Sequence, residues 1–179
     1  MEDIEKLLAG APHGDVWKEQ TFRAIGHFID AFAAVESVLR TYLAREIKLE
    51  NKYADAIVTH DFALLCTAVL TVFNETLERD EEKQKLKKCI SDARQLNDLR
   101  VKVVHGYWEP YFSAGTLHHV SRRTLKKDVV AEMASHLEKQ ADAADELVQR
   151  LQHIFLRTWT IMEEVESERQ EDGQGGVDR

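Results

Sequence analysis

Apolar side chains recur at steps of three and four residues along most of this chain, which is the pattern of amphipathic helices. The pattern predicts four long helices, over residues 16–48, 53–79, 80–104 and from Thr124 to about residue 165. The first helix is expected to turn one apolar face inward, formed by Phe22, Ile25, Ile29, Phe32, Leu39 and Leu43. The third is expected to bury Leu86, Ile90, Ala93, Leu96 and Val103. Asp61 is a good N-cap residue, so a break near His60 is expected within the second helix.

Residues 107–123 break the helical pattern. Two short runs of strand-forming residues flank a Ser-Ala-Gly turn, which predicts a small β-hairpin. Gly106 is expected to end the third helix in the manner of a C-terminal glycine. Residues 1–15 are expected to form a loose N-terminal arm and residues 166–179 a disordered polar tail, which leaves one domain over residues 16–165. The predicted fold class is therefore all-α with one small hairpin.

Composition supports a helical fold. The 179 residues include only two prolines, Pro12 and Pro110, and long glycine-free stretches, which argues against an all-β or a disordered chain. The net charge of −8 excludes a non-specific nucleic-acid binder. Residues 80–128 nevertheless carry a net charge of +4, from eleven Lys or Arg and seven Asp or Glu. This basic segment either receives a confined anionic ligand or is a chance fluctuation on solvated helices.

Several features indicate a cytoplasmic protein without a cofactor. Cys66 and Cys89 form neither a disulfide framework nor a zinc motif, so both are expected to be reduced thiols. The first residues do not resemble a signal peptide. The longest apolar run, residues 62–73, is shorter than the about 20 residues of a membrane span. The chain has no Gly-rich phosphate loop, dinucleotide fingerprint or Ser-His-Asp arrangement, so neither a metal nor another cofactor is expected.

Glu36 interrupts the apolar face of the first helix, between Phe32 and Leu39. One interpretation is that Glu36 lies at the margin of this face and reaches solvent. The other is a partly buried carboxylate, which must then have a partner because burying an unpaired charge is costly.

One short stretch, residues 96–108, combines side chains that suit phosphate chemistry. Arg100 and His105 are separated by four residues, and Asn97 precedes Arg100 by three, on the same helix face. On an ideal helix His105 lies about 140° around the axis from Arg100. The two side chains therefore converge if the helix loosens at its end, beside Gly106, or if a second copy of the motif faces the first across a dimer axis.

A guanidinium and an imidazole can act together on a phosphodiester. The guanidinium binds phosphate with two parallel hydrogen bonds and stays charged. The imidazole titrates near neutral pH and can act as general base or acid on an RNA 2′-hydroxyl, without a metal. The spacing alone is not specific, because an Arg and a His at a helix end are commonly a cap and a surface residue.

The stretch Asn-Asp-Leu-Arg-Val-Lys-Val-Val-His-Gly-Tyr-Trp resembles the signature of the HEPN superfamily, an Arg followed after four to six residues by a His at the end of a third helix. It is similar to the small bacterial members whose first helix carries an inward glutamate, here Glu36. The resemblance implies an antiparallel four-helix bundle that forms a homodimer in which two motifs share one cleft. It also implies a metal-independent endoribonuclease, such as a toxin or a defence effector.

By this resemblance Arg100 would hold the phosphate, His105 would act as acid and base, and Asn97 would orient the pair or the substrate. Supporting positions are Glu36, Asp98 and Tyr107. Candidate RNA contacts are Lys102, Trp108, Arg122 and Arg123. The two aromatic residues, Tyr107 and Trp108, either stack a base or pack the hairpin onto the helices.

Other members of the family use the bundle without cleavage. The alternative function is therefore a non-catalytic dimerisation or interaction module, such as an antitoxin, a scaffold or a nucleotide-binding accessory protein. The negative charge of Asp98 and of the whole chain counts against a strong grip on RNA. The expected partners are RNA, a second copy of the chain and a cognate antitoxin or other partner protein. His118 and His119 are neighbours on the predicted hairpin, so they point to opposite faces and cannot share a metal ion.

Overall fold

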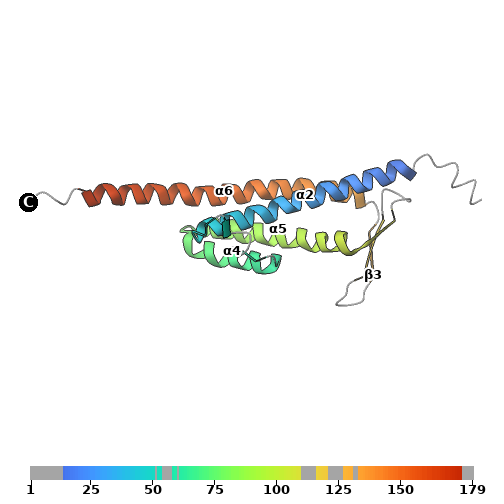
Figure 1. Cartoon of the computed structure of the whole chain (residues 1–179), viewed down its shortest axis with the longest axis horizontal. Coiled ribbons are helices and arrows are strands. Elements are labelled where there is room, and N and C mark those ends of the chain that lie inside the picture. Colours follow the sequence, from blue (N-terminus) through green and yellow to red (C-terminus); the bar gives the residue numbers. More distant parts are fainter. Residues whose placement is uncertain are drawn as a thin grey trace, which may run out of the picture. The chain divides into compact units, whose positions relative to one another are not determined.

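The computed structural model describes residues 14–50, 52–53, 58–59, 61–109, 116–120, 127–130 and 133–174. Over these residues the chain is mostly helical, with four helices and a small antiparallel sheet (Figure 1). The helices are α2 (Gly14–Glu46), α4 (Phe62–Thr76), α5 (Asp80–His105) and α6 (Met133–Gln174). The strands are β1 (Tyr107–Glu109), β2 (Thr116–Val120) and β3 (Lys127–Val130). None of the helices in this part of the chain is long and apolar enough to cross a membrane.

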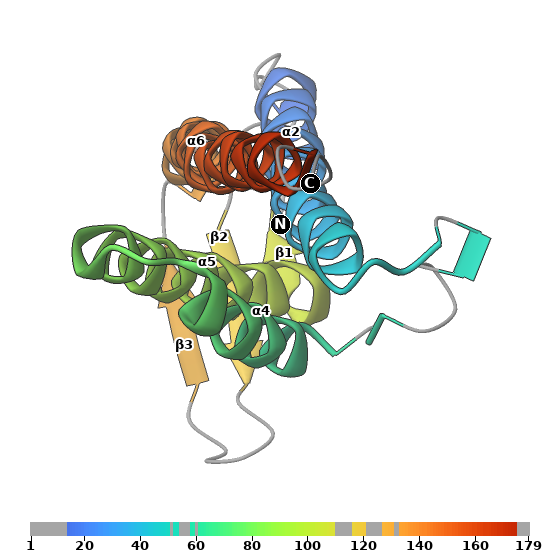
Figure 2. The ribbon, with the colours of Figure 1, turned by 90° about the vertical axis from the view of Figure 1, so that its left-hand side faces the viewer.

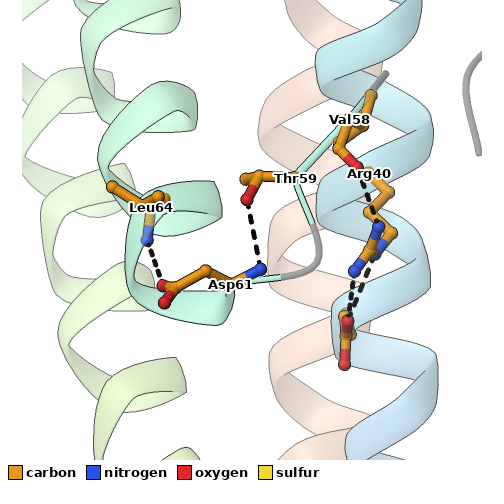
Figure 3. Close-up of polar contacts among 6 residues, drawn as sticks. Arg40, Val58, Thr59, Asp61 and Leu64 are labelled. Carbon is orange, nitrogen blue, oxygen red and sulfur yellow. Dashed lines mark hydrogen bonds and ion pairs between the residues drawn. The ribbon is translucent and has the colours of Figure 1, made fainter. Parts of the chain in front are cut away.

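The break predicted near His60 is confirmed by the start of α4. The carboxylate of Asp61 accepts a hydrogen bond from the backbone N–H of Leu64 at 2.9 Å, which satisfies one of the free donors of the first turn (Figure 3). The helix ends at Thr76, so α4 is shorter than the predicted span of 53–79. The first turn of α5 then places three acidic residues where the helix dipole favours negative charge.

The inward face of α2 agrees with the prediction at Phe32, Leu39 and Leu43 but is rotated in the first part of the helix. Phe22 is 51% exposed, whereas Phe28 and Val35 are fully buried. The buried positions of α2 are Thr21, Ala24, Phe28, Ala31, Phe32, Val35, Leu39, Leu43 and Ala44. Apolar residues on this helix form two overlapping stripes at helical spacing, and the packing of the neighbouring helices decides which stripe turns inward.

The predicted hairpin after α5 is confirmed by the antiparallel pair of β1 and β2, and β3 extends it to a three-stranded sheet. The strands are antiparallel in the order β1-β2-β3, which Figure 2 shows side by side. The register pairs Tyr107 with His118, and His118 with Val129. The last helix consequently begins at Met133 and not at Thr124. Val129 lies within the span predicted for the last helix but belongs to β3, because a β-branched residue also suits a half-buried strand.

The long last helix continues to Gln174. It therefore includes residues 166–174, which the sequence assigned to a disordered tail. This segment is rich in Glu, Gln and Arg, which have good helix propensity. Its sequence does not have the regular apolar spacing on which the helix prediction relied. Residues 175–179 and most of the predicted N-terminal arm lie outside the described residues.

The chain divides into two compact units, each with its own core. The first unit comprises residues 1–35 and 95–145, and the second comprises residues 36–94 and 146–179. In the first, the largest fully buried side chains are Phe28, Leu117, Met133 and Leu137. In the second, Phe155 of α6 packs against Phe73 of α4, with ring centroids 4.5 Å apart. The predicted inward face of α5 is confirmed, because its five residues are all buried.

Candidate functional site

The end of α5 is fixed to the sheet by close packing within the first unit. The indole N–H of Trp108 donates a hydrogen bond to the carbonyl oxygen of Val103 at 3.0 Å. Leu117, opposite Trp108 in the register, is 1% exposed. A Cβ atom at Gly106 would lie 2.3 Å from Leu117 Cδ1 and 2.6 Å from the carbonyl oxygen of Lys102. Gly106 is therefore required because β2 approaches the helix end closely.

The conformation of Gly106 corrects one expectation. Its φ angle does not lie in the left-handed region, so Gly106 does not end α5 as a left-handed C-terminal glycine does. The last helical residue is His105. The helix therefore keeps its geometry across the whole motif and does not loosen before Gly106.

This regular geometry separates the two central side chains of the motif. Arg100 and His105 leave α5 in directions about 140° apart and are offset by about 7.5 Å along its axis. Of the two ways in which they could converge, loosening of the helix end is thus not observed. Arg100 is partly exposed and His105 is exposed. Within the described residues, neither has a hydrogen bond or an ion pair.

The other residues predicted for the motif lie around these two. Asn97 is partly exposed, one turn before Arg100, and Asp98 beside it is exposed. Lys102 is partly exposed. The remaining candidate RNA contacts, Arg122 and Arg123, lie outside the described residues.

Tyr107 and Trp108 have different environments, although they are adjacent in the sequence. Successive residues of a strand point to opposite faces of a sheet. Trp108 shares a face with buried Leu117 and is hydrogen-bonded to α5, so it packs the sheet onto the helix. Tyr107 is on the other face and is 67% exposed. His118, which is partly exposed, lies opposite Tyr107, with ring centroids 6.3 Å apart.

Glu36 belongs to the second unit and has a partner there. Its carboxylate accepts a hydrogen bond from Arg40 Nη2 at 2.6 Å and one from Arg40 Nε at 3.2 Å. Arg40 Nη1 also donates to the carbonyl oxygen of Val58 at 3.3 Å, which ties the segment before α4 to α2 (Figure 3). Both side chains are mostly buried, at 27% and 18% exposure. The interpretation of Glu36 as a partly buried, paired carboxylate fits, and its supporting role at the motif stays a prediction.

No family model, curated protein or solved structure matches this chain. Among the described residues, no group of three or more His, Cys, Asp and Glu side chains is placed to hold a metal ion. The function is therefore inferred from the residues at the end of α5 and from the resemblance of their motif.

Proposed function

We propose that this protein is a metal-independent endoribonuclease of the HEPN type, with Arg100 and His105 acting on an RNA phosphodiester. The proposal rests on the surroundings of the Arg100 guanidinium. A partly exposed guanidinium without a carboxylate partner among the described residues is available for an anion. An exposed histidine follows it at the end of the same helix.

The two side chains have different roles in the proposed reaction. His105 as general base removes the proton from the 2′-hydroxyl, whose oxygen then attacks the adjacent phosphorus. Arg100 donates hydrogen bonds to the non-bridging oxygens, where negative charge accumulates in the transition state. The bond to the 5′-oxygen breaks as the protonated His105 of a second copy of the chain donates a proton to it, which leaves a 2′,3′-cyclic phosphate. Asn97, on the Arg100 face of α5, orients the phosphate.

The acid and the base come from two copies of the motif in this proposal. Because α5 is regular through His105, one copy directs Arg100 and His105 to different sides of the helix. A homodimer of helical bundles, in which two α5 ends face each other, brings the Arg100 of one copy near the His105 of the other. Such a dimer suits the function of a toxin or defence effector that a partner protein holds inactive.

The test is cleavage of a panel of structured and single-stranded RNAs in EDTA. We expect His105→Ala and Arg100→Ala to abolish cleavage, and Arg100→Lys to restore little, because an ammonium cannot make the two parallel hydrogen bonds. His136→Ala removes another exposed helical histidine, and Arg94→Ala removes another exposed arginine of α5. Both controls should cleave as the wild type does.

A non-catalytic dimerisation module is the alternative, which the net charge of −8 favours. It predicts a dimer that binds a partner protein and leaves every RNA of the panel intact. Expression in a host cell also distinguishes the two functions. A ribonuclease should slow growth, and His105→Ala should relieve this effect.

A further inference from the structure

The sheet presents a row of exposed and partly exposed side chains beside the motif. The register places Tyr107, His118 and Val129 opposite one another on the three strands, so they share the face turned away from α5. Tyr107 is 67% exposed and Val129 is 50% exposed. The rings of Tyr107 and His118 are in contact, which gives the row an aromatic end. We call these three residues the outer row.

The outer row is joined directly to the candidate site. Only Gly106 separates His105 from Tyr107, so their Cα atoms are at most about 7 Å apart. The close packing of Gly106 against Leu117 and against the carbonyl oxygen of His118 fixes β2 relative to the helix end. The position of the outer row relative to His105 is therefore set by packing within one unit of the fold.

The sequence around the outer row is strongly basic. Residues 100–129, which include the outer row, contain six Lys or Arg and two acidic residues, Glu109 and Asp128, which gives +4 in a chain whose net charge is −8. An exposed aromatic ring in a basic segment suits a ligand that combines a planar ring with negative charge. A nucleotide has both, because its base offers a π-face and its phosphate offers the charge.

We infer that the outer row binds an unpaired nucleobase of the RNA, next to the phosphodiester on which His105 acts. The base stacks on Tyr107, with His118 supporting the ring from the next strand and Val129 extending the apolar surface. A paired base has both faces covered by its neighbours in a helix, so this surface selects single-stranded RNA. The inference rests on the proposed function, which it deepens by naming the substrate class.

The test measures binding separately from cleavage. The His105→Ala protein is titrated with a single-stranded RNA that carries one fluorescent 2-aminopurine base, with the same RNA made abasic at that position, and with a duplex. Tyr107→Ala should weaken binding of the single strand by about 5- to 150-fold, the range for loss of one stacked base. Tyr107→Phe should bind within about two-fold of the parent, because it keeps the ring. Tyr53→Ala, at a tyrosine of the second unit that is 47% exposed, is the control and should bind as the parent does.

Quenching of 2-aminopurine that disappears in Tyr107→Ala, together with an unchanged affinity for the abasic RNA, supports the inference. Equal affinity of Tyr107→Ala and its parent for the single strand overturns it, as does an equal loss for the abasic RNA. Absence of RNA binding by the parent also overturns the inference. A change in the sedimentation of Tyr107→Ala without a change in its RNA affinity overturns it as well, because Tyr107 would then contact another copy of the chain and not the RNA. If the wild type does not cleave but binding depends on Tyr107, the proposed ribonuclease function fails while the base site stands. If the wild type cleaves and Tyr107→Ala binds equally well, the base site fails alone.

Discussion

Replacement of two glycines by alanine should change stability in opposite directions. At Gly106 the new Cβ would meet the buried Leu117 side chain at 2.3 Å and the backbone carbonyl oxygen of Lys102 at 2.6 Å. Such overpacking costs about 1–3 kcal/mol. Alanine recovers about 0.4–1 kcal/mol by restricting the unfolded chain. Gly106→Ala should therefore lower the free energy of unfolding by about 1.3 kcal/mol, the difference between the midpoints of these two ranges.

Gly26 is the matched control, because it lies in the middle of helix α2 and its added Cβ would meet nothing within 4 Å. Gly26→Ala should raise the free energy of unfolding by about 0.5–1 kcal/mol, the difference in helix propensity. Urea unfolding followed by circular dichroism measures both changes, provided that the denaturant slopes agree. A Gly106→Ala protein as stable as the wild type would show that β2 does not approach the helix end as closely as described.

Three further predictions concern single side chains. Asp61→Ala should lower the free energy of unfolding by about 1 kcal/mol in urea melts, because α4 loses its N-cap hydrogen bond, and an unchanged midpoint would contradict this. The hydrogen bond to Glu138 raises the pKa of His27 above 6.5, against the opposing effect of desolvation, so its stabilisation is complete below pH 6.5 and is lost as the pH rises through the raised pKa. His27→Gln should thus reduce the melting temperature more at pH 5.5 than at pH 9, by the equivalent of about 0.2–1 kcal/mol for such an exposed pair, and an equal reduction at both pH values would refute the assignment. Burial raises the pKa of the Cys66 and Cys89 thiols, so an aromatic disulfide reagent at pH 8 should label them only in the unfolded protein, whereas rapid labelling of the native chain would be unexpected.

The helical elements were predictable from sequence where one interpretation of the apolar pattern dominated. In α4 and α5 a single stripe carries most of the large apolar residues, and residues such as Leu65 and Ile90 are buried as their spacing indicates. In α2 the stripe of Phe22 competes with the stripe of Phe28, and local spacing does not distinguish them. Only packing against other helices decides that Phe28 is buried and that Phe22 is exposed.

The sheet shows a second limit of sequence patterns. Val129 fits the helical period of the following segment and also suits a strand, and pairing with β2 decides in favour of the strand. The same pairing separates Tyr107 from Trp108. From the sequence, each of these two aromatic residues could either stack on a base or pack against the helices. Which of them faces α5 depends on the register of β1 with Leu117 and His118.

The candidate site was predictable as a motif and not as an arrangement. The resemblance of the stretch around Arg100 and His105, and not their spacing alone, suggests phosphodiester chemistry, but the regular end of α5 appears only in the structure. The sequence also did not decide which residue pairs with Glu36. An ion pair with Arg40 on the same helix and a role at the motif are both compatible with the sequence.

Cleavage of a single-stranded RNA in EDTA, with wild type, His105→Ala and His136→Ala compared side by side, decides whether the end of α5 is a ribonuclease site. The wild type and His136→Ala should cut the RNA to products with 2′,3′-cyclic phosphate ends. His105→Ala should give no detectable product, because loss of a general acid or base slows the reaction by a factor of about 10² to 10⁴. Cleavage by His105→Ala at the wild-type rate, or no cleavage by any of the three proteins, would contradict this assignment.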